Sequence, residues 1–442
     1  MPMLLEENII NKLEKINWDF AGEKTQYLTH KFHSYPARYI PQIPRTFIEL
    51  FTSKGDYVLD PMCGSGTTLV EAMLTGRNAI GNDYNPLAVL ISKAKTTMIS
   101  EEDFVYLAHK LSELSQEIRG RRQEIGVKLP GRKLSKLFTR QNLSSINLIK
   151  QMIEELKKEN KNELCDFCQV ALSATIWSFI ESEGKRDIKS GFQKKIQIMK
   201  KELLLMKNSI LTPNPSILVQ QGDARDLSIG SNSIDLIVTS PPYVNALDYY
   251  REHMYNMYFL DIDVNKFKKN EIGGHSHFIA NRFRLLSEYL GDMLRVMIEM
   301  SRVLKKNKYC VIVVGNSSLE YELIESHKFF KAFASAVGFK HEVTLFRNID
   351  KTRKYTSKEI GQIDDEYIIV FKKQTESMID KSDNVAVTNL IRSELLSFRE
   401  KIQKSPGSSL GSKKPTKKRL GDNVVKIDEA IESINSDIKI NL

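Results

Sequence analysis

A short apolar run, a glycine turn and the start of a helix follow one another in Tyr57-Val-Leu-Asp60-Pro-Met-Cys-Gly-Ser-Gly-Thr-Thr68. Residues 67–75 continue with apolar side chains at helical spacing. The pattern then repeats, because residues 78–83 form a second run that ends in an acid and residues 88–94 are again helical in spacing. Strands that alternate with helices predict an α/β fold with a mostly parallel sheet.

The strand pattern is interrupted over residues 100–212, which are rich in Glu, Lys, Leu and Gln at helical spacing and predict a helical insertion. Residues 1–99 and 213–373 are therefore two parts of one domain. Further elements are expected in the second part, namely strands at 217–221, 234–238 and 309–314, a helix at 286–304, and an antiparallel strand pair at 340–346 and 366–372.

The composition changes near residue 374, and residues 374–442 are expected to form a basic, flexible tail with a short terminal helix near 424–434. Residues 401–421 hold seven basic residues and no acids. The chain has a net charge of +10, and without these seven it has +3. A basic excess points to nucleic acid, so we expect local contacts from the folded part and salt-sensitive affinity from the tail.

The 442 residues are 41% hydrophobic and 27% charged, which is typical of a globular protein. Four cysteines suit a reducing compartment. The N-terminus has no secretory pattern, and the longest strongly apolar run is far shorter than a membrane helix needs. We therefore expect a cytoplasmic protein without a membrane partner. The pair Cys165 and Cys168 lacks a second Cys or His pair nearby, so no metal site is expected.

The glycines of Gly64-Ser-Gly66 let a backbone approach a ligand closely. A phosphate-binding loop would place lysine after the second glycine, where this chain has Thr67. A dinucleotide fingerprint would need a third glycine at Leu69. The pattern favours a ligand that needs close backbone contact without a phosphate clamp, and an ordinary strand–helix turn is the alternative.

Three of the expected strands are followed by an acid, at the edge where open parallel sheets bind ligands. These acids are Asp60, Asp83 and Asp223. Asp83 ends the second run and suits the two hydroxyls of a ribose. Asp223, in Gly222-Asp-Ala224, suits an adenine amino group. Each of these aspartates taken alone is as typical of a capping or turn residue.

The stretch Thr239-Ser240-Pro-Pro-Tyr243 follows another expected strand. Its prolines remove two backbone donors and leave carbonyls free to accept. An exocyclic base amine is a poor nucleophile, because its lone pair is delocalised into the ring. The Ser240 hydroxyl and the Pro241 carbonyl suit an acceptor role toward that amine, and Tyr243 suits stacking on a flipped base. A buried Pro-Pro turn is the alternative.

With these motifs the sequence resembles the S-adenosylmethionine-dependent DNA amino-methyltransferases. Residues 60–68 resemble their donor motif, and Thr239–Tyr243 resembles their catalytic motif in the Ser-first form typical of N4-cytosine enzymes. The proline-rich residues 30–44 resemble the element that packs on the methionine end of the donor. The resemblance covers roughly 30–99 and 216–373. Many N4-cytosine enzymes place the catalytic motif first, whereas here the donor motif comes first.

The resemblance implies a Rossmann-like methyltransferase with a seven-stranded sheet that moves a methyl group from S-adenosyl-L-methionine to N4 of cytosine in duplex DNA, without a metal. It implies the catalytic residues Ser240, Pro241, Pro242 and Tyr243. The donor-binding residues that it implies are Tyr35, Pro36, Asp60, Pro61, Cys63, Gly64, Ser65, Gly66, Thr67, Thr68, Asp83, Tyr84, Asn85, Asp223 and Ala224.

Aromatic and basic residues after the catalytic motif are candidate DNA contacts, and a solvated charged face is the alternative. They are Tyr249, Tyr250, Arg251, Lys268, Lys269 and Arg282. Target recognition is expected in 100–212, in 244–285 or in both. We expect a restriction–modification role with a separately encoded endonuclease. Adenine-N6 methylation, RNA amino-methylation and DNA binding without catalysis remain as alternatives.

Overall fold

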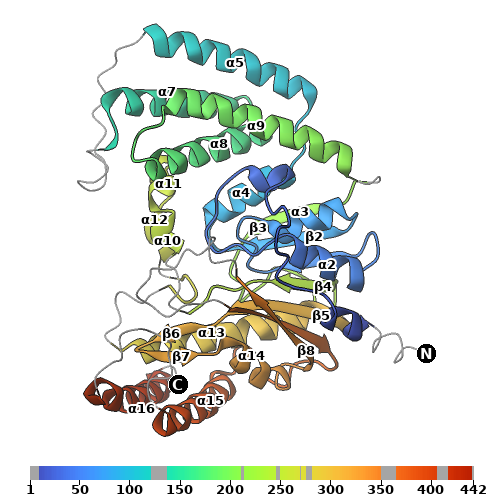
Figure 1. Ribbon diagram of the computed structural model, residues 1–442, viewed down its shortest axis with the longest axis vertical. Coiled ribbons are helices and arrows are strands. Elements are labelled where there is room, and N and C mark those ends of the chain that lie inside the picture. Colours follow the sequence, from blue (N-terminus) through green and yellow to red (C-terminus); the bar gives the residue numbers. More distant parts are fainter. Residues whose placement is uncertain are drawn as a thin grey trace.

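The computed structural model describes residues 9–120, 137–210, 214–244, 249–268, 270–274, 281–349, 365–405 and 417–440. Seven strands form one sheet in the order β3-β2-β1-β4-β5-β9-β8 (Figure 1). These strands are β1 (Tyr57–Asp60), β2 (Asn78–Asp83), β3 (Ile217–Gln221), β4 (Ile234–Thr239), β5 (Leu304–Gly315), β8 (Phe339–Asn348) and β9 (Asp365–Lys373). Strand β9 is antiparallel to both of its neighbours, and the pairs among β1–β5 are parallel. The predicted α/β fold is confirmed.

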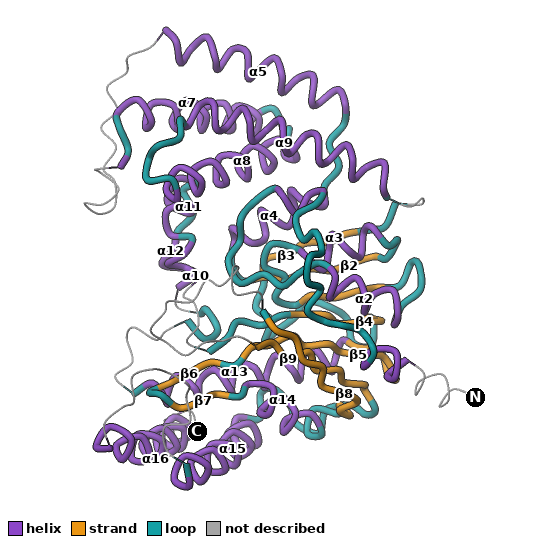
Figure 2. Tube along the Cα trace, in the orientation of Figure 1, coloured by secondary structure: helices purple, strands orange, loops and turns teal. Residues whose placement is uncertain are grey.

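Both faces of the sheet are covered by helices, as Figure 2 shows. Successive strand residues point to opposite faces, so Val58 and Leu59 of β1 enter different hydrophobic cores. The Val58 side packs against α2 (Gln42–Phe51) and α3 (Thr67–Leu74). The Leu59 side packs against α13 (Arg282–Val303) and α14 (Ser326–Ala334). Burial on both faces explains why strands such as β1 and β4 are apolar.

The chain order across the sheet reverses between β1 and β4. From β1 the chain moves outward to β2 and β3, and it later returns to the other side of β1 to form β4 and β5. In open sheets of this kind, ligands bind in the crevice beyond the carboxyl ends of the strands at the reversal. The glycine turn after β1 and the Pro-Pro stretch after β4 both lie at this edge.

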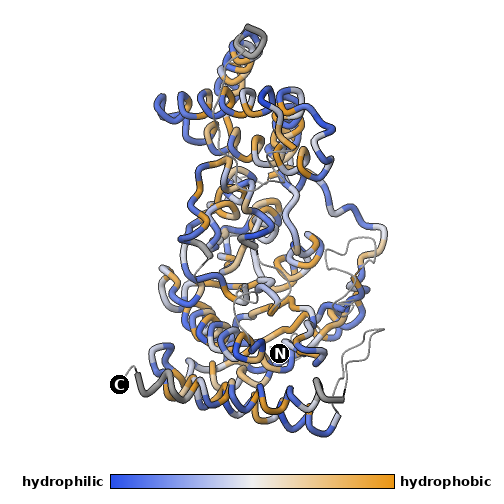
Figure 3. Tube along the Cα trace, turned by 90° about the vertical axis from the view of Figure 1, so that its left-hand side faces the viewer, coloured by the Kyte–Doolittle hydropathy of each residue, from blue (hydrophilic) through white to orange (hydrophobic). Residues whose placement is uncertain are grey.

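The predicted insertion contains four long helices in its described part: α5 (Glu101–Gly120), α7 (Arg140–Lys158), α8 (Asn162–Glu181) and α9 (Ile188–Ser209). They share a hydrophobic core to which Phe32, Leu87 and Ile91 outside the insertion also contribute. In Figure 3 hydrophilic and hydrophobic residues alternate along them, as expected of amphipathic helices. Helix α8 contacts α4 (Pro86–Thr96), and α9 contacts the 3-10 helix η1 (Leu28–Lys31). The insertion therefore packs on the donor-motif half of the domain (Figure 1).

The C-terminal region differs from the predicted flexible tail over 374–442. Helix α15 (Asn384–Lys404) packs on α13, and α16 (Lys417–Ile440) packs on both. Leu395, Ile402 and Ile431 are buried in the same core as α13. The expected short terminal helix is thus the long α16. The physical reason is the apolar stripe on each helix, which needs a partner surface. Residues 406–416 of the predicted basic linker lie outside the described residues.

Several short elements follow the Pro-Pro stretch. They are α10 (Tyr249–Glu252), α11 (Met254–Phe259), α12 (Val264–Lys268) and the hairpin of β6 (Ser317–Leu319) and β7 (Glu322–Ile324). Helix α11 contacts α8 of the insertion. Within the described ranges, we find no helix whose length and apolar character suffice to cross a membrane.

Candidate active site

A pocket lies at the carboxyl edge of the sheet, where β1, β2, β3 and β4 end. Most residues that the sequence predicted for donor binding and catalysis meet in its wall. They are Tyr35, Pro61, Cys63, Gly64, Ser65, Thr67, Asp83, Tyr84, Asn85, Asp223, Ala224, Ser240 and Pro242. The other predicted residues are not part of the wall, namely Pro36, Asp60, Gly66, Thr68, Pro241 and Tyr243.

The glycine turn between β1 and α3 is held from below by helix α4. Gly66 has a φ of +75°, and a Cβ there would lie 2.8 Å from the Ser92 hydroxyl oxygen, so only glycine fits. The Ser92 hydroxyl donates to the Gly64 carbonyl at 2.8 Å. The buried Lys95 ammonium donates to the Ser65 carbonyl at 2.7 Å. Because α4 binds two carbonyls of the turn, the backbone of the turn is held in place at the pocket wall.

Asp60 supports the turn from inside and does not line the pocket. Its carboxylate is 1% exposed and accepts a 2.5 Å hydrogen bond from the Thr68 hydroxyl. The Tyr39 hydroxyl hydrogen-bonds both Asp60 and Thr68. Burial raises the pKa of Asp60 to about 6, against the effect of its hydrogen-bond donors. Asp60 and Thr68, predicted as ligand residues, thus tie β1 to α3 and to the segment that carries Tyr39.

Asp83, at the end of β2, lines the pocket and also braces the turn. One carboxylate oxygen accepts the Gly64 N–H at 2.7 Å, and the other accepts the Asn85 N–H at 2.8 Å. Burial raises the pKa of Asp83 to about 6, and the two backbone donors oppose that rise. A carboxylate offers about four acceptor positions, so positions remain for a ligand's hydroxyl groups.

The thiol of the cysteine in the turn has low reactivity. Burial, with the nearby carboxylates of Asp83 and Asp60, raises the pKa of the Cys63 thiol well above its usual value. A protonated thiol is a weak nucleophile. Cys63 therefore serves as a wall of the pocket.

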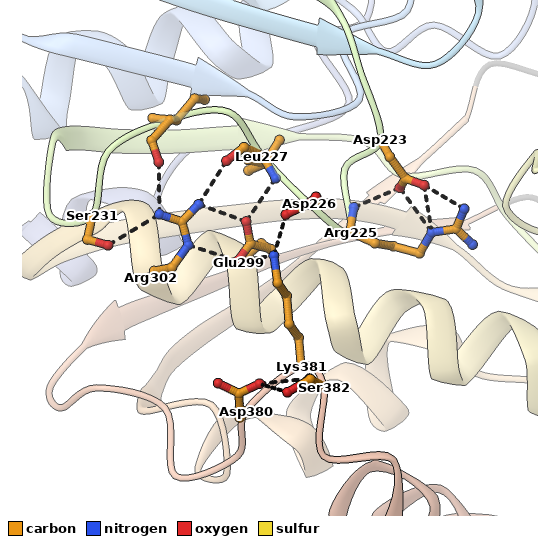
Figure 4. A network of polar contacts seen from close by, with 11 residues as sticks. Asp223, Arg225, Asp226, Leu227, Ser231, Glu299, Arg302, Asp380, Lys381 and Ser382 are labelled. Carbon is orange, nitrogen blue, oxygen red and sulfur yellow. Dashed lines mark hydrogen bonds and ion pairs between the residues drawn. The ribbon is translucent and has the colours of Figure 1, made fainter. Parts of the chain in front are cut away.

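Asp223, after β3, lines the pocket, but its carboxylate is already engaged by an arginine. The Arg225 guanidinium forms hydrogen bonds of 2.7–3.1 Å to both Asp223 oxygens (Figure 4). Arg225 also donates to Asp292 of α13 at 2.7 Å. The bidentate pair fixes the orientation of Asp223. The sequence had singled out Asp223 without its partner.

The loop that carries Asp223 is fastened to α13 by a second set of contacts. Glu299 accepts the Leu227 N–H at 2.8 Å, and Arg302 donates to the Leu227 carbonyl at 2.9 Å. Lys381 reaches Glu299 from the segment before α15 at 3.2 Å. Figure 4 shows these residues converging on the loop between β3 and β4. The C-terminal segment thus helps to hold one wall of the pocket.

The Pro-Pro stretch after β4 presents Ser240 and Pro242 to the pocket. The Pro242 carbonyl accepts a 2.9 Å hydrogen bond from the Tyr289 hydroxyl, which leaves one of its two lone pairs. The Tyr243 hydroxyl donates to Glu366 of β9 at 2.9 Å. Glu366 in turn pairs with Arg347 of β8 at 2.6 Å. These bonds fix the stretch against the far strands of the sheet.

A sequence model of the DNA methylase family matches residues 9–94 and 234–424. The chain belongs to the DNA methylase family. The match includes the glycine turn, the Pro-Pro stretch and α15, and it omits residues 95–233, which contain the four insertion helices.

Similar proteins include two methyltransferases. The chain is 24% identical to the Type II methyltransferase M.MvaI of Kocuria varians, over 79% of this chain and 91% of the relative. It is 22% identical to the Type II methyltransferase M.MjaII of Methanocaldococcus jannaschii, over 70% and 77%. A solved S-adenosylmethionine-dependent methyltransferase from Methanosarcina mazei aligns with a TM-score of 0.32 at 10% identity, over 78% of this chain and 100% of that one.

This DNA methylase uses S-adenosyl-L-methionine as its methyl donor, which confirms the predicted cofactor. The pocket suits such a ligand, because it combines a glycine backbone, carboxylates and aromatic rings. The turn carries Thr67 where a phosphate-binding loop would have a lysine.

Sequence reasoning missed several wall residues of the methylase pocket. They are Ala37, Arg38, Tyr39, Met62, Asn270, Glu271 and Ile272. The Asn270 side chain donates to the Tyr84 hydroxyl at 2.8 Å and so closes the pocket over the end of β2. Arg38 and Tyr39 lie in the proline-rich segment that the sequence had marked as a unit, but nothing in the spacing indicated which side chains face inward.

The predicted DNA contacts are only partly within the described residues. Arg251 on α10 is exposed. Arg282, at the start of α13, is half exposed, and its Nε lies 3.8 Å from Glu320. Lys269 and the side chains of Tyr249, Tyr250 and Lys268 lie outside the described part of the chain.

Proposed function

We propose that this DNA methylase transfers a methyl group from S-adenosyl-L-methionine to the exocyclic N4 of cytosine at a specific site in duplex DNA. The observation that carries the proposal is that Ser240 and Pro242 line the same pocket as Gly64 and Asp83. The Ser-first form of the catalytic stretch supports cytosine over adenine.

The pocket supports one orientation of the donor. Asp83 accepts the ribose hydroxyls, and the loop around Asp223 and Ala224 meets the adenine. The backbone at Gly64 faces the methionine part. Holding the donor and the base amine in line supplies much of the rate enhancement, because orientation converts a bimolecular step into a local one.

The exocyclic amine of the base is a weak nucleophile, and the protein must make it reactive. The Ser240 hydroxyl and the Pro241 carbonyl accept from the N4 hydrogens and favour the pyramidal nitrogen that attack requires. The nitrogen then bonds to the donor's methyl carbon while the carbon–sulfur bond breaks. The products are the methylated base, S-adenosylhomocysteine and one released proton. Tyr243 stacks on the extruded base.

We propose phosphate contacts for Arg251 and Arg282, together with the adjoining Tyr249, Tyr250, Lys268 and Lys269. We propose target recognition for the insertion at 100–212, of which the described helices α8 and α9 pack on the donor half of the domain, or for residues 244–285. The Type II relatives support a restriction–modification role with a separately encoded endonuclease.

Nucleoside analysis tests the proposal. Purified protein, labelled donor and unmethylated duplex DNA should give N4-methyldeoxycytidine after digestion, and Ser240→Ala should give far less. Product found only as N6-methyldeoxyadenosine would refute the cytosine assignment. Methyl transfer to RNA but not to duplex DNA would refute the DNA assignment.

A further inference from the structure

Three segments of the chain meet behind one wall of the donor pocket. They are the segment before α2, which contributes Tyr35 to the wall, helix α8 of the insertion, and the short helix α11, which follows the Pro-Pro stretch. Helix α11 lies beside α8, as Figure 1 shows. The donor pocket therefore touches both regions proposed for target recognition through one buried junction.

A single hydroxyl group joins all three segments. The Ser173 hydroxyl of α8 lies 2.9 Å from Nε2 of His33 and 2.8 Å from the side-chain nitrogen of Asn256 on α11. Asn256 also donates to the Ser173 carbonyl at 2.7 Å. All three side chains are buried, so these hydrogen bonds form away from solvent.

The direction of the hydrogen bonds follows from His33. Its Nδ1 lies 2.6 Å from the Ser34 carbonyl, which can only accept, so Nδ1 carries the hydrogen. Burial pushes the pKa of His33 well below its ordinary value, and the neutral ring leaves Nε2 as an acceptor. The Ser173 hydroxyl therefore donates to His33 and accepts from Asn256. The result is one directed chain of hydrogen bonds from α11 to the segment that carries Tyr35.

Stacked rings form a second link at the same junction. The His253 ring, at the start of α11, stacks on the Tyr35 ring with 4.6 Å between centroids and 27° between planes. The Trp177 ring of α8 lies 5.7 Å from the His253 ring. Because Tyr35 lines the donor pocket, a shift of α11 would displace part of the pocket wall.

The packed junction carries an energetic cost of its own. His253 is fully buried, yet neither of its ring nitrogens has a hydrogen-bond partner among the described residues, and the same holds for the buried Nε1 of Trp177. Buried polar groups without partners are costly and uncommon. An arrangement of α11 that returns these groups to water therefore competes with the packed one. Two arrangements of similar free energy are what coupling between sites requires.

We propose that Ser173 is a positioning residue that couples the binding of target DNA to the binding of the methyl donor. The inference rests on the proposed function, in which the insertion or residues 244–285 recognise duplex DNA. Bound DNA favours the packed arrangement of α11, and the Ser173 hydroxyl passes this preference to the segment that carries Tyr35. Each ligand then tightens the binding of the other by the same factor.

Calorimetric titration of S-adenosylhomocysteine, with and without a saturating unmethylated duplex oligonucleotide that contains the target sequence, measures this coupling. In the wild-type protein the duplex should tighten S-adenosylhomocysteine binding by about 5- to 150-fold, the usual range for coupled sites. In Ser173→Ala the factor should fall to less than about threefold, because the hydroxyl bonds to His33 and Asn256 are both lost. A role in general stability would instead weaken binding and leave the factor unchanged.

Thr175→Val is the matched control. Thr175 is also a buried residue of α8, but its hydroxyl donates to the Ala171 carbonyl at 2.8 Å within the same helix. Loss of this hydroxyl should leave the factor at its wild-type value. If Ser173→Ala fails to fold, Asn256→Leu makes the same comparison, because it removes the donor to Ser173 and keeps the size of the side chain.

A Ser173→Ala variant that keeps the wild-type factor would overturn the inference, and so would a wild-type protein whose affinity for S-adenosylhomocysteine is the same with and without the duplex. An equal loss of coupling in Thr175→Val would also overturn it, because the effect would then belong to α8 in general. A protein that methylates adenine would refute the proposed function and leave the coupling intact. A protein that does not bind the duplex at all would overturn both.

Discussion

Protonation of Asp83 should weaken donor binding. Its two oxygens accept the N–H groups of Gly64 and Asn85 at 2.7 and 2.8 Å, and burial raises its pKa to about 6. The ionised form accepts both of these donors and the ribose hydroxyls proposed for the donor. A protonated carboxyl loses part of this capacity and directs its own hydrogen into the site. Affinity should therefore follow the ionised fraction of Asp83.

The expected size follows from the pKa. With a pKa of about 6, nearly all of the carboxyl is ionised at about pH 7.5 and roughly a tenth at about pH 5, so affinity should fall about 10-fold, or ~1.4 kcal/mol. The effect of Asp83 on folding has the opposite sign. The folded state binds this proton more tightly than the unfolded state, so the contribution of Asp83 to the free energy of unfolding grows as the pH falls through this window. Weaker donor binding at acidic pH would therefore not be the result of a loss of folding stability caused by Asp83.

Calorimetric titration with S-adenosylhomocysteine between these pH values is the assay. Asp83→Asn keeps the size of the side chain and removes its charge, so it should bind more weakly at about pH 7.5 by roughly 10- to 100-fold. It should also lose the decline toward acid. Asp60 has a similar pKa of about 6, so the Asp83→Asn variant is needed to tell the two carboxyl groups apart. A wild-type affinity that stays flat, or an Asp83→Asn variant that keeps the full decline, would refute the assignment to Asp83.

Three further outcomes are expected. Gly66→Ala should lower the free energy of unfolding by about 1–3 kcal/mol in urea titrations, because the residue has a φ of +75° and its new Cβ would meet Ser92; an unchanged midpoint would argue against the geometry of the turn. Tyr243→Phe should lower kcat only modestly, because it keeps the ring and loses only the hydroxyl bond to Glu366. Tyr243→Ala should lower kcat by about 100-fold, because it loses stacking worth roughly 1–3 kcal/mol. Donor affinity should be unchanged in both variants, and equal rates for the two would contradict stacking. Leu395→Ala should cost about 2–5 kcal/mol of stability, because this α15 side chain is fully buried, and a wild-type unfolding curve would restore the flexible-tail interpretation.

The sheet edge could be predicted because it depends on local patterns. The apolar runs at Tyr57–Asp60 and Asn78–Asp83 coincide with β1 and β2, and the glycine turn between strand and helix lies where the sequence indicated. The parallel order then brings strand-end acids to one edge. That rule does not say which acid faces a ligand. Asp60 turns inward because Thr68 and Tyr39 hold it, and such contacts depend on the tertiary structure.

Contacts between residues distant in the sequence could not be predicted either. Arg225 neutralises Asp223 and reaches Asp292 on a helix nearly seventy residues away, which no spacing indicates. Arg38 faces the pocket because its segment folds back on β1.

The C-terminal error had a different cause. The change in composition near residue 374 predicts a tail, whereas Val387, Ile391 and Leu395 recur every fourth residue and predict an amphipathic helix. Those side chains are buried in α15. The apolar spacing within this region is thus a better guide to its structure than its overall composition.

The most direct test of the central claim is base-resolution sequencing of DNA from cells that lack other DNA methylation and express this protein. We predict N4-methylcytosine at one fixed sequence context, and its absence in cells that express Ser240→Ala. Modification confined to adenine, or modified cytosine that persists unchanged with Ser240→Ala, would contradict the account.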